Sequence, residues 1–520
     1  MPATDDQTAV IDFLSRPGSY PDGVTAVETI TTHASVIFLA GNHAYKLKRA
    51  VKYSYLDYTT VEDRQRACAA ELTLNRRTAP SLYLDTWPIV RSPGGDLRFD
   101  GAGKALDWVV VMRRFPQDSL FNNLATQGAL SPLLLRQLTD RIAAFHDAAE
   151  IDTEYGGAAG VAAVLKINDE NLRRTLNDPA SIYQTDTLRA LTQASLERHR
   201  SLLDQRRATG RVRQCHGDLH LGNICLVEGQ PTLFDCIEFS KLISCIDVLY
   251  DLAFLLMDLR YRGLRRPCGQ VFNRYLDLAG DDDGLPLLPL FMSLRAAVRA
   301  HVAGAAAQAD EQHQQEHLTE AKRYLEFAID LLRPIPPGLV AIGGLSGSGK
   351  STVAAAVAGA IGPAAGARVL RSDVIRKQLF QVPPEQALPA ESYTAEVSKR
   401  VYAEIEVRAT RALQSGQTVI IDAVSAMPEE RDAFERLARS CGVTFSGVWL
   451  DVAPATMQTR IGTRAADASD ANATVLQRQL TYDLGAVNWH RVDANGDLNT
   501  IIETVQGYLG ARQAAGEPVS

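Results

Sequence analysis

The chain has 520 residues, of which 46% are hydrophobic and 22% are charged. This composition argues against a disordered chain, and the length predicts about two or three domains. The net charge of −7 argues against nucleic acid as a partner, because an acidic chain is repelled by a phosphate backbone.

In chain order, short strands are predicted at residues 36–39, 44–47 and 108–112, with a helix between them at 60–77. From residue 132 onward the pattern is mainly helical and includes helices at 134–149 and 246–259. A small β-rich lobe followed by a larger helical lobe is therefore expected. The acidic run at 281–283 is interpreted as a solvated turn.

The clearest domain boundary is the segment Pro334-Ile335-Pro336-Pro337-Gly338. Its three prolines cannot continue the helix predicted before them at 316–332. A short buried strand is predicted directly afterwards, at 339–342. We therefore expect one domain over residues 1–333, a linker over 334–338, a second domain over 339–512 and a flexible tail over 513–520.

The cysteines favour a reducing compartment. They form no CxxC pair, their number is odd, and most have apolar neighbours, which predicts buried thiols and no disulfide framework. The seven positions are Cys68, Cys215, Cys225, Cys236, Cys245, Cys268 and Cys441. The acidic N-terminus has no signal-peptide pattern, and no apolar run is long enough to cross a membrane. A cytoplasmic protein without a membrane partner is expected.

The first chemical motif lies in residues 215–224, which read Cys-His-Gly-Asp-Leu-His-Leu-Gly-Asn-Ile. Asp218 and Asn223 are five residues apart, and this is the spacing of the kinase catalytic loop HRDxxxxN. Phosphoryl transfer needs a carboxylate near the acceptor hydroxyl and an amide oxygen on Mg²⁺. Asp235 ends the next apolar strand and can bind the metal. The alternative is a zinc site at Cys215, His216, His220 and Cys225, for which no second ligand arm exists.

The sequence HGDLHLGN followed by FDCIEF resembles the aminoglycoside phosphotransferase and choline kinase superfamily. The resemblance implies that Asp218 is the catalytic base, that Asn223 and Asp235 hold Mg²⁺, and that His216 supports the loop. Residues 247–253 also resemble this family, in which we interpret them as structural.

The same resemblance predicts an ATP-binding lysine in the β-rich lobe. Ala44-Tyr45-Lys46 resembles the Ala-x-Lys of kinases and favours Lys46, whereas Lys48 has the same strand parity and stays an alternative. Glu71 is the expected partner of this lysine, and Met112 lies on the strand against which adenine is expected to stack. Residues 31–35 stand in place of the usual loop GxGxxG, which leaves open how this site holds phosphates.

The second chemical motif begins at Gly344, where Gly-Leu-Ser-Gly-Ser-Gly-Lys-Ser fits GxxxxGK[ST] completely. A strand is predicted before it and a helix after it, at 352–360. The glycines let backbone N–H groups turn toward phosphates, Lys350 can reach the β and γ phosphates, and Ser351 can hold Mg²⁺. The predicted nucleotide-binding residues are Gly344, Ser346, Gly347, Ser348, Gly349, Lys350, Ser351 and Thr352.

Further polar residues are expected around this P-loop. Asp422 ends an apolar strand, where P-loop enzymes place a magnesium-site acid. Asp373 could accept a proton from a substrate hydroxyl, and Arg376 could hold an anionic substrate group. Arg460 and Arg464 share a helical face and could close over the transferring phosphoryl, although a solvated charged face is the alternative.

This set resembles small-molecule P-loop kinases, such as gluconate and shikimate kinases, and zeta-type toxin kinases, over about residues 338–510. The whole chain resembles bacterial fusions of an aminoglycoside-phosphotransferase-like domain with an ATP-binding P-loop domain. The expected fold is α+β and α/β: a bilobal protein-kinase-like fold, then a P-loop NTPase with a parallel sheet flanked by helices and a mobile lid.

The predicted function is a two-domain ATP-dependent phosphotransferase that uses ATP and Mg²⁺. Each domain would move the γ-phosphoryl of ATP to a hydroxyl group of a small molecule, at its own active site. The alternative is a regulatory protein in which one or both sites bind ATP with little transfer, and the missing glycine-rich loop favours it for the first site. The sequence identifies neither acceptor, and it does not decide the oligomeric state.

Overall fold

The computed structural model describes residues 6–21, 23–32, 34–53, 56–99, 101, 103–463 and 468–515. Arg464, His33 and the last five residues of the predicted tail lie outside the described residues. The chain divides into two compact units. The first unit comprises Met1–Val164 and Arg200–Leu255, and the second comprises Leu165–His199 and Leu256–Ser520.

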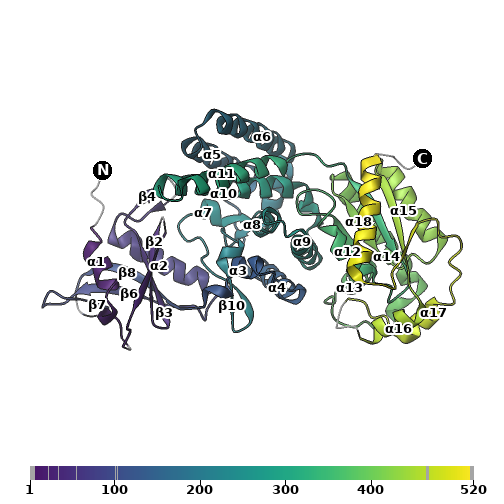
Figure 1. Ribbon diagram of the computed structural model, residues 1–520, viewed down its shortest axis with the longest axis horizontal. Helices are drawn as coiled ribbons and strands as arrows, with labels where there is room; N and C mark the ends of the chain where they lie inside the picture. Colours follow the sequence, from purple (N-terminus) through teal and green to yellow (C-terminus); the bar gives the residue numbers. More distant parts are fainter. Residues whose placement is uncertain are drawn as a thin grey trace. The chain divides into compact units, whose positions relative to one another are not determined.

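The first unit contains a six-stranded antiparallel sheet in the order β1-β2-β3-β8-β6-β7 (Figure 1). The strands predicted at 36–39, 44–47 and 108–112 are confirmed within β2, β3 and β8. The strands are β1 (Val27–Thr31), β2 (Ser35–Ala40), β3 (His43–Lys48), β6 (Tyr83–Arg91), β7 (Leu97–Phe99) and β8 (Ala105–Arg113), and a separate pair is β4 (Lys52–Tyr53) and β5 (Leu56–Asp57).

The two faces of this sheet pack against different helices, because successive residues of a strand point to opposite sides. Val109 and Val111 of β8 share a core with α1 (Thr8–Leu14), which η1 (Pro17–Ser19) follows. Val110 and Met112 share a core with α2 (Val61–Asn75). The hydroxyl of Thr60 accepts the Asp63 N–H and so caps the start of α2. The sheet face that carries Met112 is therefore the face that α2 covers.

After the sheet the chain is mainly helical, as predicted. The elements are η2 (Gln117–Ser119), α3 (Phe121–Thr126), α4 (Pro132–Ala148), α5 (Gly157–Thr175), α6 (Pro179–Ala208), η3 (Leu221–Asn223), α7 (Lys241–Ser244) and α8 (Val248–Tyr261). Two short antiparallel pairs interrupt them: β9 (Val212–Gln214) with β12 (Cys245–Asp247), and β10 (Ile224–Val227) with β11 (Gln230–Leu233). The helix predicted to start at Ile246 starts at Val248, because Ile246 pairs with Arg213 in the β9–β12 ladder.

The second unit contains a five-stranded parallel sheet in the order β14-β15-β13-β16-β17. Val340 and Ile342 of β13 share a core with α12 (Lys350–Ala358) and α18 (Leu498–Ala515), and α14 (Ala395–Gln414) and α15 (Pro428–Cys441) also contact the sheet. The strands are β13 (Gly338–Gly343), β14 (Arg368–Arg371), β15 (Val419–Asp422), β16 (Thr444–Asp451) and β17 (His490–Asp493). The P-loop architecture predicted from the sequence is confirmed.

Some helices from residue 265 onward precede the parallel sheet in the chain, and the others lie between or after its strands (Figure 1). They are α9 (Arg265–Ala279), η4 (Asp282–Leu287), α10 (Leu288–Ala309), α11 (Gln314–Asp330), α12 (Lys350–Ala358), α13 (Ser372–Leu379), η5 (Ala390–Tyr393), α14 (Ala395–Gln414), α15 (Pro428–Cys441), α16 (Pro454–Gly462), α17 (Ala473–Gln479) and α18 (Leu498–Ala515). In the described part of the chain, no helix is both long and apolar enough to cross a membrane. All seven cysteines are free and six are buried, as predicted.

The acidic run at 281–283 is not the solvated turn that the sequence suggested. Asp281 is only 1% exposed. Asp282 accepts a hydrogen bond of 2.7 Å from the buried guanidinium of Arg368, which also donates to Asp277 at 2.7 Å. A guanidinium that is removed from water needs carboxylate partners, and the acidic run supplies one of them, Asp282.

Asn273 of α9 covers the exposed edge of the parallel sheet next to this ion pair. Its side chain accepts the Val369 N–H at 2.7 Å and donates to the carbonyl of Ala367 at 3.0 Å. The carboxamide thus takes the place of a neighbouring strand on β14, the edge strand. Helix α9 and the P-loop sheet are joined by these contacts within the second unit.

We expect Arg368→Met to destabilise the protein by about 3–5 kcal/mol, because it leaves the partly buried Asp277 and Asp282 without their cation. Arg491→Met is the matched control. Arg491 also pairs with a carboxylate, Asp451, but this pair is solvent-exposed and should be worth about 0–1 kcal/mol. Urea unfolding measures both changes. Equal losses in the two variants would contradict the assignment.

Two candidate nucleotide sites

The catalytic loop predicted at residues 215–224 is fixed by Asp251 of α8. The Asp251 carboxylate accepts the N–H groups of His216 and Gly217 at 3.0 and 2.8 Å, and the Nε2 of His146 lies 3.0 Å from it. Gly217 has φ of 84°, and a Cβ there would lie 3.0 Å from the carbonyl of Ile243. The contacts agree with the structural interpretation of residues 247–253.

His216 supports the same loop from inside. Its Nε2 lies 2.9 Å from the carbonyl of Phe234, and its Nδ1 accepts the Asp218 N–H at 3.3 Å. A carbonyl can only accept, so the contact with Phe234 places a proton on Nε2. The ring therefore links the loop that carries Asp218 to the strand end that precedes Asp235.

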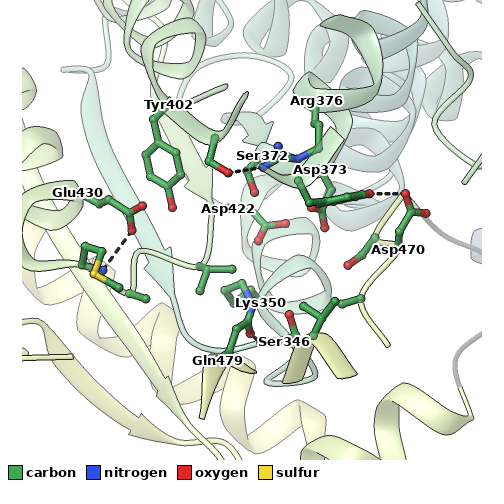
Figure 2. Close-up of a pocket in the computed structure, with 18 of the residues that line it drawn as sticks. Ser346, Lys350, Ser372, Asp373, Arg376, Tyr402, Asp422, Glu430, Asp470 and Gln479 are labelled. Atoms are coloured by element: carbon green, nitrogen blue, oxygen red, sulfur yellow. Dashed lines mark hydrogen bonds between the residues drawn. The ribbon is translucent and has the colours of Figure 1, made fainter. Parts of the chain in front are cut away.

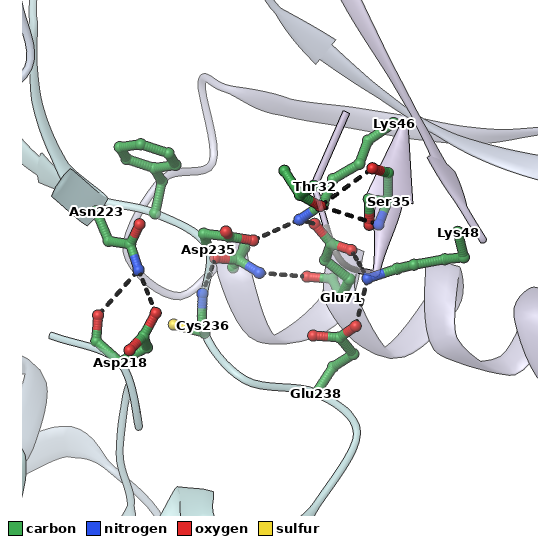
Figure 3. Close-up of polar contacts among 12 residues, drawn as sticks. Thr32, Ser35, Lys46, Lys48, Glu71, Asp218, Asn223, Asp235, Cys236 and Glu238 are labelled. Atoms are coloured by element: carbon green, nitrogen blue, oxygen red, sulfur yellow. Dashed lines mark hydrogen bonds and ion pairs between the residues drawn. The ribbon is translucent and has the colours of Figure 1, made fainter. Parts of the chain in front are cut away.

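Asp218 and Asn223 lie in direct contact, as their spacing predicted. The Asn223 Nδ2 donates to the backbone carbonyl and to Oδ2 of Asp218, at 3.0 and 2.8 Å (Figure 3). Because the amide nitrogen is engaged there, the carboxamide oxygen points the other way (Figure 3). This oxygen is the kind of group that Mg²⁺ binds.

Asp235 occupies the position at which a metal-binding carboxylate was predicted. Its φ of 65° lies in the left-handed region, a conformation that costs about 1–3 kcal/mol and clusters at functional sites. Its N–H donates to the hydroxyl of Tyr83 at 3.1 Å, and its carboxylate lies 2.5 Å from the Nζ of Lys46. The side chain is 41% exposed, so a ligand can reach it.

Both candidate lysines contact Glu71, and Lys46 is the one that reaches Asp235. The Lys46 Nζ lies 2.8 Å from Oε1 of Glu71, and the Lys48 Nζ lies 2.5 Å from Oε2 (Figure 3). Burial alone would lower the pKa of Lys46, but the carboxylates of Asp235 and Glu71 raise it well above its ordinary value. The geometry thus favours Lys46, because it is the lysine that contacts Asp235, the predicted metal-binding residue.

Two N–H groups at the connection between β1 and β2, those of Thr32 and Ser35, are bound by each other's residue. The N–H of Thr32 donates to the carbonyl of Ser35 at 2.8 Å, and the N–H of Ser35 donates to the hydroxyl of Thr32 at 3.0 Å. These donors bind within the turn and are not directed at a ligand. Met112, the predicted adenine contact, is 7% exposed and packs in the core between the sheet and α2.

The zinc alternative has no support in the described part of the chain. The ring of His220 accepts the Gly222 N–H at 3.0 Å, and the side chain of Cys225 belongs to the core beneath the sheet. The one described group with three closely spaced ligand atoms consists of His146, Cys215 and Asp251. It includes a single member of the four residues weighed as a zinc site.

The P-loop connects β13 to α12 and has the backbone shape that its glycines predict. Gly347 has φ of 83°, and a Cβ there would lie 2.7 Å from the carbonyl of Met457. No other residue fits this position without a shift of the backbone. Helix α12 begins at Lys350, whose Nζ donates to the carbonyl of Leu345 at 3.1 Å. The loop and the helix start together form a set of N–H donors suited to phosphates.

Asp422 and Ser351 lie together at the end of the sheet and fit a magnesium site. Ile342 of β13 is in register with Asp422 of β15, which places the carboxylate beside the loop. The Ser351 hydroxyl hydrogen-bonds to Asp422. Burial raises the pKa of Asp422, although Arg371, Lys350 and Ser351 oppose the shift. A buried carboxylate next to a hydroxyl is a donor set that a hard cation would stabilise.

A cavity of about 1610 Å³ joins the P-loop to the predicted substrate residues. Figure 2 shows Lys350, Asp373 and Asp422 around it. Arg376 also lines the cavity, is 8% exposed and donates to the carbonyl of Ser392 at 2.8 Å. Its buried Nε has no hydrogen-bond partner among the described residues. The lining residues from the predicted P-loop set are Ser346, Gly347, Gly349, Lys350, Ser351 and Thr352.

Arg460 contacts the back of the loop. Its guanidinium donates to the backbone carbonyls of Ser348 and Ala494, at 3.3 and 2.9 Å. Arg460 is not among the residues that line the cavity. The prediction that it closes over a transferring phosphoryl together with Arg464 stays a prediction, because Arg464 lies outside the described residues.

Several residues that line this cavity were not predicted from the sequence. The carboxamide oxygen of Gln479 accepts the N–H of Ser346 at 2.8 Å. Asp470 accepts from the buried Nζ of Lys377 and from the Leu388 N–H, each at 3.0 Å. These partners are 82 to 133 positions apart in the chain. No local motif could have indicated them.

Acidification is expected to weaken Mg²⁺-dependent ATP binding at the P-loop at a higher pH than an aspartate with an ordinary pKa of about 3.9 would. The raised pKa of Asp422 is the cause, because a protonated carboxyl cannot hold the cation. Isothermal titration across pH, with and without Mg²⁺, tests this in a Lys46→Met background. In Asp422→Asn, Mg²⁺-dependent ATP binding should no longer weaken on acidification. If the weakening is the same as in the parent, the assignment is wrong.

Two family models and several solved structures match parts of this chain. Residues 65–288 match the phosphotransferase enzyme family, and residues 339–482 match an AAA domain. A gluconokinase from Sinorhizobium meliloti 1021 is 24% identical and covers 35% of this chain and 97% of its own, with a TM-score of 0.26. A choline/ethanolamine kinase family protein from Mesorhizobium loti is 13% identical and covers 62% of this chain and 99% of its own, with a TM-score of 0.35.

Two full-length relatives come from mycobacteria. Over 482 residues the chain is 30% identical to an uncharacterized protein of Mycobacterium tuberculosis and to one of Mycobacterium bovis. Each match covers 90% of this chain and 93% of the relative. The predicted combination of an aminoglycoside-phosphotransferase-like region with a P-loop kinase region is confirmed. The chain belongs to the same protein family as these mycobacterial proteins.

Proposed function

We propose that this protein is an ATP-dependent phosphotransferase with two active sites, each of which moves the γ-phosphoryl of ATP to a hydroxyl group of a small molecule. The observation that supports this most directly is the P-loop cavity, in which Lys350, Ser351, Asp373 and Asp422 surround one space. We propose the domain limits as 1–333 for the first site and 339–512 for the second, with the proline-rich segment 334–338 between them.

At the P-loop site, the loop N–H groups and Lys350 hold the phosphates of ATP. Ser351 and Asp422 would hold Mg²⁺, which neutralises charge on the transferred phosphoryl. Asp373 receives the proton of the acceptor hydroxyl as its oxygen bonds to the γ-phosphorus and the bond to ADP breaks. Arg376 has a buried, unpartnered Nε, and it would pair with an anionic group of the acceptor.

At the first site, Asp218 is the base for the acceptor hydroxyl. Asn223 and Asp235 would hold Mg²⁺, and Lys46 would contact the phosphates while Glu71 orients it. The direct contact of Asp218 with Asn223 and of Lys46 with Asp235 supports this assignment. The free cysteines suit a reducing compartment such as the cytoplasm.

A second candidate function applies to the first site alone. The Thr32 and Ser35 N–H groups bind within their own turn, whereas a glycine-rich loop would direct such groups at phosphates. This observation favours a site that binds nucleotide and signals, with slow transfer. In that case the P-loop site would carry all of the turnover.

ATP turnover by single variants separates the two functions. We expect Lys350→Ala to lower the P-loop turnover by about 10²–10³-fold, because it removes a charge that stabilises the transferring phosphoryl. We expect Asp218→Asn to lower the turnover of the first site by about 10²–10⁴-fold, the usual contribution of a general base. Steady-state ADP release with and without candidate hydroxyl acceptors measures both.

The exposed residues Lys166 and Asp283 supply matched controls, Lys166→Ala and Asp283→Asn, which should leave turnover unchanged. If Asp218→Asn has no effect while Lys350→Ala abolishes all turnover, the first site is a binding or regulatory module. If neither variant lowers turnover, the proposed function is wrong.

A further inference from the structure

Five charged side chains of alternating sign form a continuous row in the first unit. They come from β3, α2 and the loop after β11, and run Asp235, Lys46, Glu71, Lys48, Glu238 (Figure 3). Asp235 is the exposed end of the row. The side chain of Lys48 is 3% exposed and that of Glu238 is 4% exposed. The proposed function uses the first three residues and leaves Lys48 and Glu238 without a function.

Glu71 binds the two lysines through different oxygens. Lys46 contacts Oε1 and Lys48 contacts Oε2, because residues two apart on a strand lie on the same face. When one lysine moves away, the other still compensates the buried carboxylate. Lys46 can therefore turn toward a bound phosphate without leaving Glu71 as an isolated buried charge.

Lys48 is not free to make the same movement. Its ammonium pairs with Glu238 as well as with Glu71 and lies 5.4 Å from the ring centroid of Tyr58. The hydroxyl of Tyr58 donates to the same oxygen of Glu238, at 2.6 Å. Burial alone would lower the pKa of Lys48, but Glu238 and Glu71 raise it, so the lysine stays charged in this enclosure. Lys48 therefore stays in its ion pairs, whereas Lys46 can exchange its contact with Glu71 for a contact with a phosphate.

Glu238 ends the short segment that begins with Asp235. Between them, the Cys236 N–H donates to the side chain of Asn75 at 2.8 Å, and the Ile237 N–H donates to the carbonyl of His216 at 2.9 Å. Each residue of the segment is therefore held by a group from another part of the first unit. The Lys48–Glu238 ion pair joins the far end of the segment to β3, the strand that carries Lys46.

We propose, on the basis of the function assigned to this site, that Lys48 and Glu238 are positioning residues that fix Asp235 for Mg²⁺ and leave Lys46 free for the nucleotide. The two lysines therefore have different roles at this site. Lys48 stabilises Glu71 and the metal-binding segment, and Lys46 contacts phosphate. The pair acts through Asp235 and touches neither the metal nor the acceptor.

The test uses the full chain with Lys350→Ala, so that ATP binding reports on the first site. Two quantities are measured for each variant: the thermal midpoint, and the Mg²⁺ concentration that gives half-maximal ATP binding. Lys46→Met should weaken ATP binding at least tenfold with a thermal midpoint near that of the parent. Lys48→Met and Glu238→Gln should raise the Mg²⁺ requirement about tenfold, and Lys48→Arg should keep it within about twofold.

The double variant Lys48→Met/Glu238→Gln separates positioning from folding. It removes both charges, so we expect it to regain thermal stability relative to Lys48→Met while the raised Mg²⁺ requirement persists. Lys52→Met is the matched control, because Lys52 forms an exposed pair with Asp57 on the neighbouring β4–β5 hairpin. It should change neither quantity.

Two results would overturn the inference. If Lys48→Met and Glu238→Gln lower the thermal midpoint and leave the Mg²⁺ requirement unchanged, the pair is structural only and the function proposed for the site stands. If the Lys350→Ala chain binds no ATP, the function proposed for the first site fails and the inference fails with it.

Discussion

Compensation of buried charge is the constraint on which both candidate sites depend. Each site contains a charged group that is removed from water and meets its counter-charge on a distant segment. Glu71 on α2 meets two lysines of β3, and Lys377 on α13 meets Asp470, 93 positions away. Breaking such a pair leaves an isolated charge in a medium of low dielectric constant. The pairs thereby fix which segments lie together.

Three groups at the two candidate sites carry backbone strain, a raised pKa or an unsatisfied polar atom. Asp235 holds a left-handed backbone and an exposed carboxylate at the end of its charge row. Asp422 is a buried carboxylate with a raised pKa, and Arg376 has an unpartnered buried nitrogen. Strain and unsatisfied polar groups persist only where the surrounding structure enforces them. The strained backbone of Asp235 and the unsatisfied Nε of Arg376 are therefore arguments for function that do not depend on the motifs.

The sequence predicted those parts of the sites that are local in the chain. The P-loop and the contact of Asp218 with Asn223 depend on a few consecutive residues whose types and spacing determine their geometry. The sequence did not reveal the Gln479 contact with Ser346, because 133 positions separate the two residues. It also misjudged the acidic run at 281–283, since an acidic turn is solvated only if no buried cation such as Arg368 requires it. Ion pairs between residues that are far apart in the chain leave no pattern in the local sequence.

Lys46 and Lys48 show that the tertiary fold distinguishes residues that the motif alone leaves equivalent. Strand parity puts both ammonium groups on one face, and the segment that distinguishes them lies almost 190 positions later, at Asp235 and Glu238. Backbone N–H groups are engaged by the protein at both sites. Those of Thr32 and Ser35 bind within their own turn, and that of Ser346 in the P-loop donates to Gln479. In the function proposed for the first site, Lys46 and a metal held by Asp235 would bind the phosphates. The positioning of Asp235 is therefore central to how that site would bind ATP.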